Sequence, residues 1–238
     1  MHLLVVLLIA FWFFYRRYKK NKPLIAARIA EEKEKDRLKD LRRDTRRRQW
    51  ALALADILAR RNGLPTKGVT LAFSVDDDKR HYLVQQVKKE LGLAEKLDHD
   101  ALRQQVTEIL RRWPAGIGRS PRTFYHHLAV QGQVRDALAF DCMRTAFLTR
   151  CLAGLGWCDE NQAWLVLLLN AQRAQDCFHS WEDYATAYVR ARRVWLTLHD
   201  TPTTIAGRDL QEVTHYLKDP LSRWQKLPWK EFKIFDPI

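Results

Sequence analysis

The chain has 238 residues, 47% of them apolar, and a formal net charge of +13, which suits one globular domain with appendages. The charge is uneven. Between Arg16 and Arg61, 17 Lys and Arg residues stand against 7 Asp and Glu residues, whereas the remaining residues hold 24 against 21. Because nucleic-acid binding requires a basic face on the folded domain, this distribution argues against a nucleic-acid partner and favours anionic lipid headgroups.

The N-terminus begins with an unbroken apolar run of 13 residues, from Leu3 to Tyr15. Aromatic residues lie at the end of this run, and five cationic residues follow: Arg16, Arg17, Lys19, Lys20 and Lys22. Aromatic rings favour the membrane interface, and Lys and Arg favour its cytoplasmic side. Residues 1–18 are therefore predicted to be a single-pass membrane anchor, with the C-terminal domain in the cytoplasm.

Two alternatives to an anchor stay open for this run. A spanning helix usually needs about 17–25 apolar residues, so a run of this length also fits an in-plane or buried helix. A cleaved signal peptide is the other alternative. That interpretation is weaker, because no Lys or Arg precedes the run and basic residues occupy the place of a small-residue cleavage site.

Helical patterns dominate the rest of the chain, and the predicted fold is all-α. Residues 19–49 form a predicted basic, charged helical stalk, in which Glu31 and Lys35 have the spacing of a helical ion pair. No helix breaker occurs from Pro23 to Arg61, and Asn62-Gly63 should end that helix. A compact helical domain is expected over residues 50–218, followed by an aromatic tail over residues 219–238 that packs on it.

Within the domain, several helix starts and stops can be located from capping residues. Helices are expected after Asp76, Asp98 and Asp159, and a capping box of the form Ser-x-x-Asp begins at Ser180. Further helices are expected from Ser120-Pro121, with a break near Gly132, and from Arg208 to Leu217. Thr201-Pro202-Thr203-Thr204 should lie in a loop. Residues 66–78 give no clear signal for either a strand or a helix.

One segment resembles the bacterial domain of unknown function 1266 family. The resemblance rests on Phe140-Asp141-x-x-Arg144, Gly156-Trp157, Glu160-x-x-Ala163-Trp164, Ser180-Trp181-x-Asp183, Tyr188 and Ala191-Arg192-x-x-Trp195. It covers about residues 50–199. Two positions depart from the family pattern, because Ala191 replaces a common Gly and Leu91 an expected Trp. The resemblance implies a helical bacterial domain and no established chemistry. Together with the predicted anchor, it gives a bacterial inner-membrane location as the expectation.

The candidate binding residues come from these motifs: Asp141, Arg144, Trp181, Asp183 and Arg192. Asp141 and Arg144 lie one turn apart on an apolar helix, so a structural ion pair is the simpler interpretation. The alternative is catalytic: Asp141 would be a general base, and Arg144 or Arg192 would bind an anionic substrate.

Metal and cofactor sites are not expected. The cysteines Cys142, Cys151, Cys158 and Cys177 lack CxxC spacing and should be reduced thiols in a cytoplasmic domain. Two polar clusters were considered as ligand sets, namely Asp176 with His179, Glu182 and Asp183, and Tyr125-His126-His127. Neither is favoured, because their residues need not share one helix face.

Two functions follow from these features. The favoured hypothesis is a membrane-anchored, cytoplasm-facing binding or regulatory protein without catalytic activity, whose partner is another protein. The alternative is an enzyme that acts on a phosphate- or carboxylate-bearing substrate through Asp141, Arg144 and Arg192. A cleft where these three residues converge would favour the enzyme, and a buried, mutually satisfied cluster would favour the binding protein.

Overall fold

The computed structural model describes residues 2–118, 122–199, 203–231 and 233–235, without the side chains of residues 2–10, 23, 25 and 203–206. The chain divides into two compact units, residues 1–45 and residues 46–238. Helix α1 (His2–Ala53) forms the first unit and contributes its last turns to the second.

The first unit is a continuous helix whose described side chains are almost all exposed. An ion pair between Glu31 and Lys35 at 2.6 Å lies along it, as the charge spacing predicted, and a second pair joins Glu34 and Arg37 at 2.7 Å. Nearer the N-terminus, six large aromatic side chains are exposed: Phe11, Trp12, Phe13, Phe14, Tyr15 and Tyr18. Within the residues described, none of the helices combines the length and the apolar character needed to cross a bilayer.

The second unit contains helices and no strand over its described residues, which confirms the all-α prediction. Its elements after α1 are α2 (Asp56–Arg61), α3 (Asp77–Leu91), α4 (His99–Arg111), a 3₁₀ turn (Trp113–Ala115), α5 (Arg122–Val130), α6 (Val134–Gly154), α7 (Glu160–Cys177), α8 (Trp181–Thr197), α9 (Thr203–Lys218) and α10 (Arg223–Lys226). Residues 66–75 contain neither a helix nor a strand.

The helix starts follow the capping residues in the sequence. The carboxylates of Asp76, Asp98 and Asp159 accept hydrogen bonds from backbone N–H groups in the first turns of α3, α4 and α7. Ser180 caps α8 in the same way. Gly132 has φ +69° between α5 and α6, where a break was predicted. The expected helix start at Ser120-Pro121 and the first half of the loop predicted over 201–204 lie outside the described residues. The second half of that prediction is wrong, because Thr203 and Thr204 begin α9.

The helix predicted to run to Arg61 instead ends at Ala53, and α2 begins at Asp56. The reason is tertiary. The Asp56 carboxylate is fully buried and accepts hydrogen bonds from Tyr216 Oη at 2.5 Å and from Arg223 Nε at 2.9 Å. A buried carboxylate must be paired, so these contacts fix where the chain turns.

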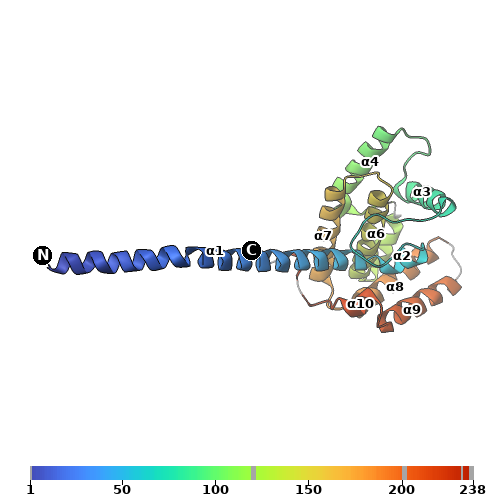
Figure 1. The fold of residues 1–238 in the computed structure, drawn as a ribbon. Coiled ribbons are helices and arrows are strands. Elements are labelled where there is room, and N and C mark those ends of the chain that lie inside the picture. Colours follow the sequence, from blue (N-terminus) through green and yellow to red (C-terminus); the bar gives the residue numbers. More distant parts are fainter. Residues whose placement is uncertain (1, 119–121, 200–202, 232, 236–238) are drawn as a thin grey trace. The chain divides into compact units, whose positions relative to one another are not determined.

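The core lies around α6, which packs against both α7 and α8 (Figure 1). A cluster of four tryptophans extends this core to the C-terminal tail: Trp50, Trp181, Trp224 and Trp229. Trp181 stacks on Trp224 with ring centroids 5.2 Å apart and lies 4.9 Å from Trp50. The indole N–H of Trp181 also donates to the carbonyl of Leu227 at 2.7 Å. The tail is thus part of the core.

The four cysteines are free thiols. Cys142, Cys151 and Cys158 are buried, and desolvation raises the pKa of each thiol to about 12. Cys177 is half-buried, and its pKa is also raised, chiefly by burial. Because the thiolate is the reactive form, these side chains act as small apolar groups of the core.

Replacing Trp181 with Ala should lower the free energy of unfolding by about 3–5 kcal/mol, because it removes the stacked centre of the tryptophan cluster and leaves the Leu227 carbonyl without its donor. Leu165→Ala is the matched control: Leu165 is 57% exposed on α7, and its loss should change stability by less than about 0.5 kcal/mol. Urea unfolding of the full chain measures both. Equal stabilities for the two variants would mean that the tail does not pack as described.

Candidate functional site

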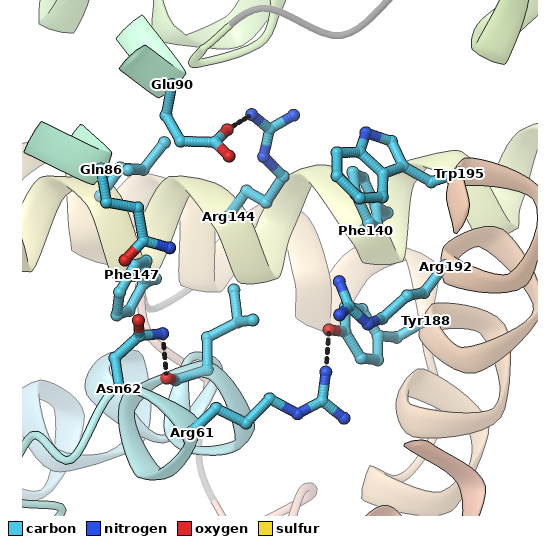
Figure 2. A pocket seen from close by; sticks show the side chains of 12 residues that line it. Arg61, Asn62, Gln86, Glu90, Phe140, Arg144, Phe147, Tyr188, Arg192 and Trp195 are labelled. Atoms are coloured by element: carbon cyan, nitrogen blue, oxygen red, sulfur yellow. Dashed lines mark hydrogen bonds and ion pairs between the residues drawn. The ribbon is translucent and has the colours of Figure 1, made fainter. Parts of the chain in front are cut away.

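A cavity of about 280 Å³ lies between α2, α6 and α8, with α3 at its edge (Figure 2). We call it the arginine cavity. Its lining residues are Leu58, Arg61, Asn62, Gln86, Glu90, Phe140, Arg144, Phe147, Leu148, Tyr188, Arg192 and Trp195. It therefore combines three guanidinium groups with aromatic and aliphatic side chains.

Helical spacing explains how α8 and α6 each present one side of the cavity. Tyr188, Arg192 and Trp195 are separated by four and three residues on α8, so they share one face of that helix. Phe140, Arg144 and Phe147 repeat this spacing on α6 and form the opposing face. The ring of Phe140 packs near Tyr188, with centroids 6.1 Å apart, and near Trp195 at 6.2 Å. Packing of the two helices creates the apolar part of the cavity.

Carboxylates hold two of the guanidinium groups from outside the lining. Arg61 pairs with Asp209 through Nη2 at 2.5 Å and with Glu212 through Nε at 2.6 Å. Arg192 Nε donates to the second oxygen of Asp209 at 2.7 Å. Asp209 is buried, and it connects α2, α8 and α9. These contacts fix Arg61 and Arg192 in place, whatever the cavity contains.

Arg144 is buried on α6 and forms an ion pair with Glu90 of α3. Its guanidinium also lies over the ring of Phe140, 5.5 Å from the centroid. Gly118 packs against this pair. A Cβ atom at Gly118 would lie 2.8 Å from Arg144 Nη2, and its φ of +86° also favours glycine.

The lining presents three cationic groups and one carboxylate, because Asp209 and Glu212 are not among the lining residues. Tyr188 adds a phenol whose pKa is raised by burial, so it is a neutral hydroxyl. Arg61 Nη1 lies 3.5 Å from this hydroxyl oxygen (Figure 2). Such a lining suits a ligand that carries a carboxylate or phosphate beside an apolar group.

Two of the predicted site residues, Arg144 and Arg192, line this cavity, and Asp141 does not. Successive helical residues point about 100° apart, so Asp141 leaves the face that Phe140 occupies. Its carboxylate instead accepts a hydrogen bond from Tyr125 Oη at 2.9 Å. Desolvation raises the pKa of Asp141, against the opposing effects of Tyr125 and Arg173. Asp141 thus contacts Tyr125, whereas Arg144 pairs with Glu90 and Arg192 pairs with Asp209. The charge of Arg144 still acts to lower the pKa of Asp141.

Trp181 and Asp183 also lie away from the arginine cavity. Trp181 is buried at the centre of the tryptophan cluster. Asp183 pairs with Arg135 and accepts the backbone N–H of His179 at 2.9 Å, which joins the start of α8 to α6. These contacts of Trp181 and Asp183 join packed elements of the fold, and neither residue lines the arginine cavity.

The two polar clusters considered as ligand sets are held by local hydrogen bonds. Asp176 accepts from Gln172 at 2.7 Å, and His127 contacts Gln131 at 2.9 Å. Among the described residues, no three His, Cys, Asp or Glu side chains are grouped closely enough to hold a metal ion.

Sequence reasoning missed Arg61, Glu90 and Tyr188 as lining residues. A signal existed for Tyr188, because it precedes Arg192 by one helical turn and so shares its face. No local signal existed for Arg61 or Glu90. Arg61 meets Glu212 across 151 residues of sequence, and Glu90 meets Arg144 across 54.

Comparison with known proteins identifies a family. The model of the family described as "Protein of unknown function (DUF1266)" matches residues 11–229, so the chain belongs to this family. The match confirms the resemblance seen in the motifs and extends beyond residues 50–199. No curated protein and no solved structure gives a significant match.

Glu90→Gln and Asp141→Asn should affect stability differently. Glu90→Gln leaves the buried Arg144 without its carboxylate and should cost about 2 kcal/mol, less than a fully buried pair because Glu90 is partly exposed. Asp141→Asn keeps an acceptor for Tyr125 and removes a desolvated charge, so at about pH 7 it should be at least as stable as the parent.

The pH dependence of unfolding also tests the effect of the Asp141 charge on stability. A folded-state pKa above the unfolded value of 3.8 means that the Asp141 carboxyl group lowers stability as the pH rises above that value. The parent should therefore lose more stability than Asp141→Asn between about pH 4 and about pH 7 in urea titrations. An Asp141→Asn protein that is clearly less stable than the parent at neutral pH would restore the ion-pair interpretation of Asp141.

Proposed function

We propose that this member of the DUF1266 family is a membrane-anchored, cytoplasm-facing binding protein without catalytic activity, which acts through protein–protein contacts. The observation that carries the proposal is the arginine cavity, in which carboxylates of the same chain hold Arg61, Arg144 and Arg192 in place. Groups fixed in this way can recognise a ligand without the entropic cost of ordering long side chains.

The arrangement supports binding over catalysis. A general base must reach the proton that it removes, and Asp141, the carboxylate assigned to that role, lies outside the cavity. The carboxylate that does line the cavity, Glu90, is paired with Arg144. The three guanidinium groups are therefore paired with carboxylates of the same chain, which favours the binding hypothesis, whereas Gln86 Oε1 and Trp195 Nε1 on the lining are buried without a hydrogen-bond partner among the described residues.

The proposed occupant is a segment of a partner protein that presents an acidic residue beside an apolar one. Its carboxylate would meet Arg144 and Arg192, and its apolar side chain would pack on Phe140 and Trp195. The volume of about 280 Å³ is at the lower end for small-molecule pockets and suits one or two side chains. Buried anchor residues in such pockets usually dominate the affinity of an interface.

The alternative, an enzyme for a phosphate- or carboxylate-bearing substrate, is supported by a single observation, namely that Arg144 and Arg192 share the cavity. It would need a catalytic group other than Asp141. We regard it as the second candidate for that reason.

The proposed membrane attachment rests on residues 1–18. Six exposed aromatic side chains between Phe11 and Tyr18 give an apolar surface that water solvates poorly. A helix of 13 residues is about 20 Å long, shorter than a hydrocarbon core of about 30 Å. Long Arg and Lys side chains at its end can reach the headgroups, and the bilayer can thin locally to accommodate it.

Deletion of residues 1–18 should move the protein from the membrane fraction to the soluble fraction, because the apolar segment is removed and the core of residues 46–238 is left intact. Fractionation after a high-salt wash measures this. A matched variant that replaces Lys19, Lys20 and Lys22 with Gln should remain in the membrane fraction. A truncated protein that still sediments with membranes would contradict the anchor.

Arg192→Gln should weaken capture of the partner at least tenfold, because it removes a cationic contact from the cavity. The tagged full-length protein is crosslinked in its own cells and purified, and captured proteins are quantified by mass spectrometry. Arg193→Gln is the control, since Arg193 is the next residue on α8, is exposed and does not line the cavity.

A partner that is captured equally by the parent and Arg193→Gln and lost with Arg192→Gln supports the proposal. Thermal melts establish that both variants are folded. Partners whose capture is unaffected by Arg192→Gln would show that the arginine cavity is not the binding site.

A further inference from the structure

A second cavity, of about 410 Å³, lies within residues 46–238 and shares no lining residue with the arginine cavity. We call it the basic cavity. Four segments of the chain contribute to it: the last turns of α1, helix α2, the loop after α2, and the region from the end of α9 through α10. Its charged lining residues are Arg46, Arg60, Lys67, Asp219, Arg223 and Lys226.

The lining of the basic cavity thus has five cationic side chains and one carboxylate. Arg60 Nη1 lies 4.0 Å from Asp219, the outer limit of an ion pair. Lys67 and Lys226 are exposed, and neither has an ion pair among the described residues. Cations gathered without matching anions repel one another, so this cavity is electrostatically incomplete.

The remaining two cations are oriented by carboxylates outside the lining. Arg46 pairs with Glu231 at 2.6 Å, and Arg223 is held by the buried Asp56. The Nε atom of Arg46 is buried without a hydrogen-bond partner. An unsatisfied buried donor is costly, which favours an acceptor at this place.

Neutral donors complete the lining. The side chains of Gln49, Thr66 and Ser222 lie among the cationic groups. Gly68 has φ +84° and open space where a Cβ would be, so the backbone of the loop is accessible to a ligand at this position.

We propose that the basic cavity binds a phosphate-bearing group that carries more than one negative charge. Such a group supplies several strong acceptor oxygens and matches the excess of cationic donors on the lining. A single carboxylate would leave one of the two unpaired lysines, Lys67 and Lys226, without a counter-charge.

A nucleic acid fits this cavity less well than a compact phosphate group. Single-stranded nucleic acids are held by stacking on exposed aromatic rings as well as by cationic side chains. The aromatic residue of the lining is Tyr216, which is 2% exposed and has the Arg60 guanidinium over its ring at 4.9 Å. Among the described residues of the lining, no ring is therefore left for a base to stack on.

The phosphate could come from an anionic phospholipid headgroup or from a soluble phosphate compound. Both present the same chemistry to Lys67 and Lys226, and the experiment has to separate them. The proposal does not depend on the arginine cavity, because the two cavities have different lining residues.

The test uses the full-length protein in vesicles of neutral phosphatidylcholine, with pyrophosphate as the probe in isothermal titration calorimetry. The parent should bind pyrophosphate, with an affinity that falls as salt is added. Lys67→Gln with Lys226→Gln should weaken binding at least tenfold, because two charge-assisted contacts are lost. Both lysines are exposed and unpaired, so the fold should tolerate their replacement.

The matched control is Lys230→Gln with Lys233→Gln, which removes the same charge from exposed tail residues outside the basic cavity. Vesicles that contain anionic phospholipid identify the source. Weaker pyrophosphate binding in them indicates that a headgroup occupies the cavity, and unchanged binding indicates a soluble ligand; either result supports the site. Absence of pyrophosphate binding by the parent, or equal affinity of the two double variants, would overturn the proposal.

Discussion

The ion pair between Asp56 and Arg223 positions both cavities. Asp56 is fully buried at the start of α2, and Arg223 approaches it from α10, 167 residues further along the chain. Desolvation raises the pKa of the Asp56 carboxyl group, and the charge of Arg223 opposes that effect. Removing either partner would leave a buried charge unpaired, so the two helices are held together strongly. This contact ends α1, orients α2 and holds the C-terminal region against the core.

Two arginines follow Asp56 on α2, and each of them lines a different cavity. Arg60 lines the basic cavity, whereas Arg61 lines the arginine cavity. Consecutive helical side chains point about 100° apart, so neighbours in sequence can face different surroundings. The same geometry separates Asp141 from Phe140 on α6 and removes Asp141 from the site. A shift of α2 by one residue would therefore alter both cavities together.

The two cavities differ in how their charges are balanced. In the arginine cavity, Glu90, Asp209 and Glu212 balance the three guanidinium groups, and aromatic rings fill much of the remaining lining. Such a site favours a ligand with apolar surface. In the basic cavity the cations outnumber the carboxylate, and the ring of Tyr216 is covered. That lining favours a compact anion, so the two proposals concern different chemistry.

The sequence by itself determined most of the helices, the caps at Asp76, Asp98, Asp159 and Ser180, and the family, because these depend on residues within a few positions of one another. It also indicated Arg144 and Arg192 as candidate binding residues, and both line the arginine cavity. Only the tertiary structure decided which acid meets which arginine. Glu90, Asp209 and Glu212 reach their partners across 54, 17 and 151 residues. The spacing of residues within one helix does not show which distant residue will be the partner, because the partners are brought together by how the helices pack.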